Sequence, residues 1–271
     1  MNKKLEKYLK SEYKRVQGWL HRVDGEIIYS ILKFQNDEKI RGSTAEIGLH
    51  HGKLFVALAM CLNNNEKAYG IDIFDKQEFN LDKSGNGSLS KFKKNLGIFN
   101  IPFEVVVIDN RQSEIINKLD ILEKVGRIRF FSIDGGHWKD VVTSDLFLAE
   151  NTIADGGVIA LDDFLRSEWP DVSLGYFSWL NETNSNIVPF AIGFNKLYLC
   201  EKSYADTYIK LLETSTFLKF FKAKNYSFLG NNIPIFNHYL LPEWSFSRQI
   251  KHFFKINFPN FYVKFRILFK R

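Results

Sequence analysis

The sequence predicts an α/β fold in which five parallel strands and a terminal antiparallel hairpin form one sheet, with helices on both faces. Short apolar runs alternate with helix-length amphipathic segments between residues 43 and 181. Such alternation implies right-handed crossovers between parallel strands. Two further apolar runs, 187–194 and 196–201, are separated only by Asn195. Because so short a link cannot make a crossover, we expect these two strands to be antiparallel.

The expected elements follow one another with short turns. Residues 4–34 carry helical periodicity and precede the first strand. The expected strands are 44–49, 68–74, 103–108, 128–134 and 157–161, and the expected helices are 52–62, 89–96, 112–122, 138–152 and 171–181. We divide the chain into an N-terminal helical cap (1–42), a central α/β domain (43–202), a C-terminal extension of helices and loops (203–245) and a basic aromatic tail (246–271).

Cysteine usage and the absence of long apolar runs predict a cytoplasmic protein. Cys61 and Cys200 lie in apolar segments without metal-type spacing, which is typical of buried thiols in a reducing compartment. Residues 1–15 are charged throughout and lack the apolar centre of a signal peptide. No run of about 18 apolar residues is present that could span a membrane.

The net charge of +6 is concentrated in the tail. Residues 248–271 contain seven Lys or Arg and no acid, so the rest of the chain is close to neutral. An enzyme that modifies nucleic acid should carry its basic surface beside the active site, and a nucleic-acid substrate is therefore not expected. Between residues 246 and 271, seven Phe interleave with these basic residues. A basic helix with an aromatic face can lie at the anionic inner face of a membrane. Alternatively, its aromatic face can pack on the central domain or on a second subunit.

A glycine-rich turn follows the first expected strand. Glu46, Gly48 and Gly52 stand in the segment Ala45-Glu46-Ile47-Gly48-Leu49-His50-His51-Gly52. Glycines at such a turn let a ligand approach the backbone at a helix N-terminus. The segment is not the dinucleotide fingerprint, because His50 replaces its second glycine. Asp72 ends the second strand, 24 residues after Gly48, where an acid can accept hydrogen bonds from a ribose diol; otherwise it is an ordinary acid at a strand end.

Three aspartates end two other strands of the expected sheet. Asp134 follows one apolar strand, and Asp162 and Asp163 follow the next. Neighbouring strands lie about 4.8 Å apart, so the three carboxylates should converge at the edge where α/β sheets bind ligands. Carboxylates that close repel one another unless they are protonated or bind a cation, and oxygen ligands favour Mg²⁺, with Mn²⁺ or Ca²⁺ as alternatives. The other interpretation is that these aspartates cap loops.

These motifs together resemble methyltransferase family 24 of the class I methyltransferases. The resemblance covers residues 18–202. The sequence is also similar to the macrocin-type sugar O-methyltransferases and, more remotely, to catechol O-methyltransferase. The segments that carry it are Gly18-Trp19-Leu20, Glu46-Ile47-Gly48, Ile133-Asp134-Gly135-Gly136-His137, Asp155-Gly156-Gly157, Leu161-Asp162-Asp163-Phe164 and Trp169-Pro170-Asp171-Val172. The resemblance implies the Rossmann-like sheet of that class, with 43–202 as an S-adenosylmethionine-binding catalytic domain.

The resemblance also assigns roles to residues of this sequence. Glu46, Gly48 and Gly52 correspond to the methionine end of the cofactor site and Asp72 to its ribose. Asp109 and Ser113 match the adenine-side positions less closely. Asp134, Asp162 and Asp163 match the metal ligands of the metal-dependent members.

Two departures from the family pattern affect the chemistry. Leu54 stands where a small hydroxyl residue is usual, and Gly136 stands where macrocin-type enzymes have an acid that serves as general base. His137 is the natural substitute, because imidazole can accept a proton from a hydroxyl at neutral pH; alternatively it orients Asp134. His50 and His51 are interpreted as local loop contacts.

The function predicted from the sequence is S-adenosylmethionine-dependent methyl transfer (EC 2.1.1.-), assisted by Mg²⁺ or another hard divalent cation, to a hydroxyl of a sugar, glycan or small metabolite. A metal-independent N- or C-methyltransferase is the alternative within enzymes. The alternative outside enzymes is a non-catalytic binding subunit that keeps the cofactor fold. The sequence also leaves a homo-oligomer open.

Overall fold

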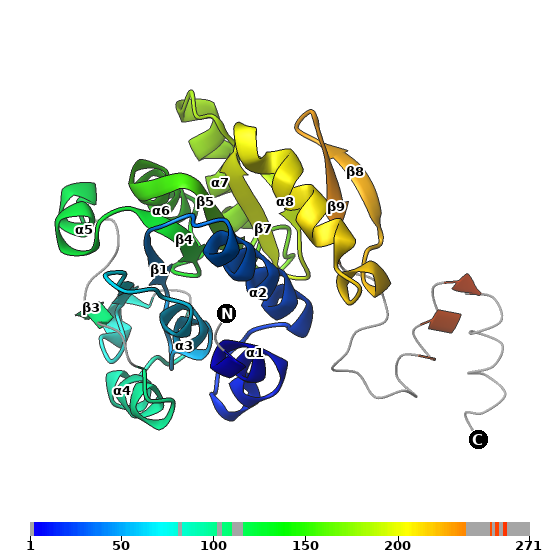
Figure 1. Ribbon diagram of the computed structural model, residues 1–271. Coiled ribbons are helices and arrows are strands. Elements are labelled where there is room, and N and C mark those ends of the chain that lie inside the picture. Colours follow the sequence, from blue (N-terminus) through cyan, green and yellow to red (C-terminus); the bar gives the residue numbers. More distant parts are fainter. Residues whose placement is uncertain are drawn as a thin grey trace, which may run out of the picture.

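A computed structural model describes residues 3–80, 83–101, 105–109, 116–236 and five positions near the C-terminus (250, 253, 254, 257 and 258), with the backbone alone for 105–109. The described residues form a nine-stranded sheet in the order β3-β2-β1-β4-β5-β7-β6-β9-β8 (Figure 1). Its strands are β1 Ser43–Ile47, β2 Ala68–Asp72, β3 Val105–Asp109, β4 Ile128–Ile133, β5 Ile153–Asp162, β6 Ile187–Ile192, β7 Lys196–Glu201, β8 Lys224–Phe228 and β9 Asn231–Ile235.

The strand directions confirm the predicted fold class. β1 to β5 pair in parallel, and β7 pairs antiparallel with both β5 and β6. The chain reverses between β6 and β7 through the three residues 193–195, and Gly193 N donates to Lys196 O at 2.8 Å to close this turn. The tight link thus sets strand direction as the sequence predicted.

Helices cover both faces of the sheet (Figure 1). One face packs against α1 Lys3–Lys10, α2 Arg22–Asp37, α3 Lys53–Met60 and α8 Lys202–Thr214, and the other against α5 Lys118–Val125, α6 Lys139–Thr152 and α7 Pro170–Glu182. Because side chains alternate along a strand, Phe130 joins the first core and Phe131 the second. α4 Leu89–Ile98 completes a smaller cluster in which Phe92 packs with Phe55.

The structure corrects two boundaries of the sequence analysis. The 203–245 segment, expected as helices and loops, contains α8 but also β8 and β9, which extend the sheet. The residues of β8 are mostly exposed, and Pro234 interrupts the apolar pattern of β9. Neither strand therefore shows an alternation of apolar and polar residues that would predict it. The 4–34 segment is split into α1, a short 3₁₀ helix and α2, which leaves Trp19 in a loop.

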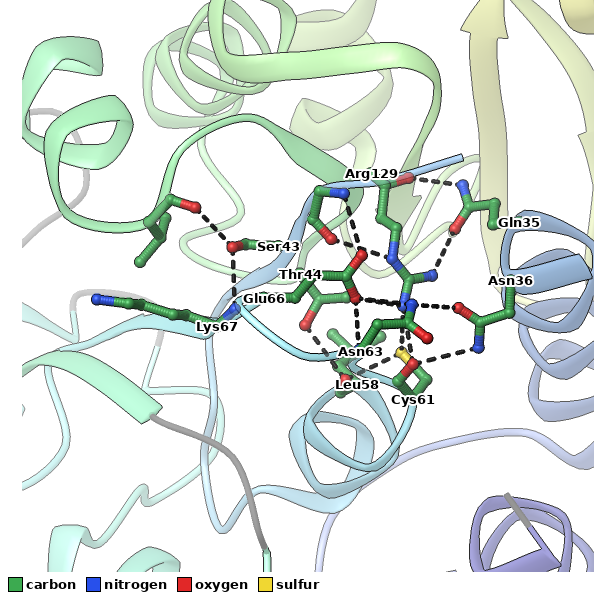
Figure 2. A network of polar contacts seen from close by, with 12 residues as sticks. Gln35, Asn36, Ser43, Thr44, Leu58, Cys61, Asn63, Glu66, Lys67 and Arg129 are labelled. Atoms are coloured by element: carbon green, nitrogen blue, oxygen red, sulfur yellow. Dashed lines mark hydrogen bonds and ion pairs between the residues drawn. The ribbon is translucent and has the colours of Figure 1, made fainter. Parts of the chain in front are cut away.

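A buried ionic network stabilises the amino ends of the central strands (Figure 2). The guanidinium of Arg129, at the start of β4, is completely buried and donates to Glu66 Oε2, to Gln35 Oε1 and to the carbonyl oxygens of Gly42 and Cys61. Gln35 in turn donates to Arg129 O at 2.7 Å. The network ties α2 to the segments that precede β1 and β2.

No helix in the described part of the chain is long and apolar enough to cross a membrane. Most of the 246–271 tail lies outside the described residues, so its membrane and packing alternatives both stay predictions.

Candidate functional site

A cavity of about 520 Å³ opens at the carboxyl ends of β1, β2, β4 and β5. Parallel strands present loops and helix N-termini at this edge, where α/β folds bind ligands. Its walls come from the glycine loop, the end of β2, the segments 77–80 and 84–87, the loop after β4 and the segment after β5. Among the predicted site residues, the lining includes Gly48, Asp72, Asp134, His137, Asp162 and Asp163.

Gly48 is required where two loops touch. Its φ is +85°, and a Cβ at this position would lie 1.7 Å from Asp134 O, so no side chain fits between the β1–α3 loop and the end of β4. Gly52 also has a positive φ, but it does not belong to the cavity lining, and a Cβ there would meet the Phe92 ring at 2.9 Å. Gly52 therefore serves packing behind the site.

Glu46 lies on β1 beneath the cavity and is not among its lining residues. Burial and the nearby Asp134 raise the pKa of Glu46 well above its usual range. Its Oε2 atom has no hydrogen-bond partner among the described residues. Glu46 is therefore a buried acid beside the site, with one carboxylate oxygen that no described donor binds.

Asp72 holds the glycine loop in place. Its carboxylate accepts hydrogen bonds from the backbone N–H groups of His50, at 2.7 Å, and Phe74. Burial raises the pKa of Asp72 against these stabilising bonds. Each carboxylate oxygen has two acceptor sites, so Asp72 can hold the loop and still accept a hydroxyl from the cavity.

The structure gives less information on the adenine-side residues. Asp109 ends β3 opposite Asp72 in the register, with only its backbone described. Ser113 lies outside the described residues.

Asp134, His137 and Asp163 converge, with one potential ligand atom from each lying within 4.8 Å of the other two. Asp134 follows β4 directly, and Asp163 follows β5 with a φ of +55°. The sequence analysis grouped Asp134 and Asp163 with Asp162 instead. Asp162 Oδ2 accepts from Lys196 Nζ at 2.6 Å, and its Oδ1 accepts from Asn195 Nδ2 at 2.6 Å. Lys196 thus supplies a positive charge to the Asp162 carboxylate, and the metal-ligand role of Asp162 stays a prediction.

Asn195 and Lys196 are site residues that the sequence analysis missed. Asn195 Nδ2 donates to Asp163 Oδ1 as well, at 2.8 Å, and so bridges the two neighbouring aspartates. Lys196 is opposite Asp162 in the antiparallel β5–β7 register and is almost fully buried. The signal was present in the tight turn itself, since a hairpin beside β5 brings its turn residues to the carboxyl end of that strand.

Burial and neighbouring charges shift the pKa values of Lys196, Asp134 and Asp163 in different directions. Burial alone would lower the pKa of the Lys196 ammonium, but Asp162 and Asp134 raise it above its usual value. Burial and the neighbouring Asp162 raise the pKa of Asp134 well above its ordinary range. Burial acts in the same direction on Asp163, but hydrogen bonds from His137 and Asn195 outweigh it and lower the pKa of that carboxyl.

A divalent cation fits this donor set. The ammonium of Lys196 binds Asp162 and makes no hydrogen bond to Asp134. A cation between Asp134, Asp163 and His137 would therefore provide Asp134 with a direct positive partner. Carboxylate oxygens suit Mg²⁺ and Mn²⁺, and the imidazole shifts the preference of the set towards Mn²⁺.

The imidazole of His137 is held on three sides. Its Nε2 lies 3.2 Å from Asp163 Oδ2, its Nδ1 lies 3.4 Å from Ser84 Oγ, and its ring stacks on Trp169 with centroids 4.2 Å apart. This position suits a group that orients Asp163. The general-base role stays a prediction.

His50 lines the cavity wall and contacts Trp19, with ring centroids 5.2 Å apart. Burial and the adjacent His51 lower the pKa of His50 to about 4. Burial also lowers the pKa of His51. Two neutral imidazoles in contact, with ring centroids 3.8 Å apart and planes tilted by 35°, agree with local loop contacts.

Comparisons with known proteins point to one family. Residues 45–164 match the model of methyltransferase family 24, which is described as a methyltransferase domain. No curated protein matches the chain. The solved structure of the O-methyltransferase NovP superposes with a TM-score of 0.54 at 12% identity, covering 65% of this chain and 79% of NovP. An O-methyltransferase from Bacillus cereus in complex with SAH gives a TM-score of 0.49 at 17% identity, covering 73% of this chain and 90% of that chain. At 12% identity the similarity to NovP shows the fold alone.

Proposed function

The central part of this chain, residues 45–164, is a class I methyltransferase domain of family 24, and from this premise we propose that the protein transfers a methyl group from S-adenosylmethionine to a hydroxyl oxygen with the help of a divalent cation. The observation that carries the proposal is the convergence of Asp134, His137 and Asp163 beside the Gly48 loop in one cavity.

The protein's part in this reaction is mainly alignment, because the cofactor carries the activated methyl group. Gly48 lets the first loop lie against the end of β4, and Asp72 would accept a hydrogen bond from the ribose of a bound cofactor. Asp134 and Glu46, whose pKa values are raised, would ionise more readily beside a sulfonium, and their ionisation would favour the cationic cofactor over the neutral product. A bound cation would lower the pKa of an acceptor hydroxyl and orient it. Asp134, Asp163 and His137 would hold that cation, while Lys196 neutralises Asp162.

The acceptor that we propose is a sugar, glycan or another small hydroxylated molecule. Trp19, Trp138 and Trp169 line the cavity together with polar groups of Gln77, Asn80, Arg166 and Glu168. Aromatic walls with a few convergent polar groups suit a ring that has an apolar face and hydroxyls at its edge. A vicinal diol would place two neighbouring oxygens against the cation site.

One observation favours the metal-independent N- or C-methyltransferase instead. Lys196 Nζ already supplies a positive charge to Asp162, and a protein cation can reduce the need for a metal. The non-catalytic alternative rests on Leu54 and Gly136. Leu54 packs in the core of the α3 face, and a Cβ at Gly136 would meet the Trp138 ring at 3.1 Å, so both departures have packing reasons.

Calorimetry with S-adenosylhomocysteine and with Mn²⁺ tests the proposal. We expect one molecule of each to bind, and Asp163→Asn to weaken Mn²⁺ at least ten-fold while S-adenosylhomocysteine still binds. Asp155→Asn is the matched control, because Asp155 is exposed at the opposite end of the same strand. Absence of S-adenosylhomocysteine binding would refute the cofactor. Its binding without any Mn²⁺ binding would refute the metal and favour the metal-independent alternative.

A further inference from the structure

Asp24 is a buried acid outside the cavity lining, and it lies on α2 in the N-terminal helical cap. Its side chain is completely buried. Tyr198 Oη donates to Asp24 Oδ1 at 2.9 Å, and the backbone N–H of Asn195 donates to Asp24 Oδ2 at 3.0 Å. Both partners belong to the β6–β7 hairpin, 171 and 174 residues further along the chain. Asp24 therefore joins the cap to the hairpin turn.

The turn is shaped to receive this carboxylate. A Cβ at Gly193 would lie 1.9 Å from Asp24 Oδ1, so only glycine leaves space for the acid. Beside it, the rings of His21 and Phe194 stack with centroids 3.6 Å apart and an interplanar angle of 18°. The beginning of α2 and the turn thus fit each other through a polar and an aromatic contact.

The same turn carries the two residues that hold the site aspartates. The residue whose N–H binds Asp24 is Asn195, and the amide of its side chain bridges Asp162 and Asp163. Lys196, the next residue, binds Asp162. One backbone segment therefore faces the cap on one side and the carboxylate cluster on the other.

Burying this acid costs stability. Burial raises the pKa of Asp24 to about 7, partly offset by Lys196. Well-packed apolar residues commonly replace buried ionic groups without loss of stability. A purely structural contact at this position would not need a carboxylate.

We propose that Asp24 is a positioning residue of the active site, which fixes the β6–β7 turn so that Asn195 and Lys196 hold Asp162 and orient Asp163 as a cation ligand. This inference rests on the proposed function for its last step, the cation. The link from cap to turn is independent of that step.

Asp24→Asn is the variant that tests it. Two donors, from Tyr198 and Asn195, point at the two oxygens of Asp24, and an asparagine can accept at only one of these atoms. Gln35→Ala is the matched control, because Gln35 is equally buried at the other end of α2 and also bonds across to the sheet. Both variants are expected to unfold at a lower temperature.

Two measurements separate positioning from stability. Hydrogen exchange of the segment 192–198 should rise at least ten-fold in Asp24→Asn and stay within two-fold in Gln35→Ala. The Mn²⁺ affinity, measured by calorimetry, should fall at least five-fold in Asp24→Asn only. In an Asn195→Ala background, Asp24→Asn should then reduce Mn²⁺ affinity by a smaller factor than in the unaltered protein, because the branch through the Asn195 side-chain amide is already broken and only the branch through Lys196 remains.

The outcomes are distinct. Unchanged exchange in 192–198 for folded Asp24→Asn would overturn the inference, as would equal losses of Mn²⁺ affinity in Asp24→Asn and Gln35→Ala. If Asp24→Asn does not fold, Gly193→Ala disturbs the same contact from the turn side and should give the same two results. If the unaltered protein binds no Mn²⁺, the proposed metal function fails, and the exchange comparison still decides whether Asp24 fixes the turn.

Discussion

Two buried ionic clusters lie at opposite ends of the same central strands, and they are built to different rules. At the amino ends, one buried base, Arg129, meets one buried acid, Glu66, and the remaining donors of the guanidinium reach carbonyls and Gln35 (Figure 2). At the carboxyl ends, Lys196 is the single almost fully buried base among the described residues, and four acids surround it: Asp24, Glu46, Asp134 and Asp162.

The difference separates stability from function within one sheet. A balanced, hydrogen-bonded pair can stay buried without any ligand. Burial, together with the excess of neighbouring acids, raises the pKa values of Asp134 and Glu46. A cation or a cationic cofactor bound there would offset this cost. Strained and unbalanced groups concentrate at functional sites for this reason.

Breaking the balanced cluster should have the largest effect. Arg129→Met would leave the buried Glu66 carboxylate without its cationic partner and the carbonyl oxygens of Gly42 and Cys61 without the guanidinium donor. We expect a loss of about 3–5 kcal/mol in the free energy of unfolding, measured by urea denaturation. A second change, Glu66→Leu, should restore part of this loss. A single-variant loss below about 1 kcal/mol would mean that Arg129 does not organise the amino ends.

The second-largest effect is expected from a side chain placed between the two site loops. Gly48→Ala puts a Cβ against Asp134 O, so we expect affinity for S-adenosylhomocysteine to fall at least ten-fold, about 1.4 kcal/mol. Gly97→Ala is the control, since a Cβ there meets nothing within 4 Å in α4. Equal affinities for both variants would contradict the role of Gly48.

Removing one of the excess acids should change the thermal stability by a smaller amount, which depends on pH. The raised pKa of Asp134 means that the native state holds its proton where the unfolded chain releases it. Native stability therefore falls as pH rises above the ordinary aspartate range. Asp134→Asn should raise Tm by about 2–4 °C at pH 8, the shift that 1 kcal/mol gives in a domain of 150–250 residues, and by less at pH 5. Added Mn²⁺ should stabilise only the unaltered protein.

The sequence contained most of the sheet and only part of the site. Apolar runs mark the strands β1 to β7, and the side chains described in β1, β2 and β4 to β7 are mostly buried, whereas β8 is mostly exposed and has no such run. Asp134 and Asp163 could be found because each directly follows a strand. For Lys196 the only signal was the tight turn, whose place beside β5 depends on strand register. Asp24 could not be found, because its role depends on a contact across 171 residues, which no local pattern encodes.

Paramagnetic broadening by Mn²⁺ tests the contrast between the two clusters most directly. In spectra of the ¹⁵N-labelled protein, sub-stoichiometric Mn²⁺ should broaden the amide signals of Gly135, Gly136 and Asn195, which lie around the carboxylates, and leave those of Gly42, Cys61 and Glu66 sharp. Broadening at both ends, or at neither, would contradict the account that only the carboxyl end of the sheet is built to take a cation.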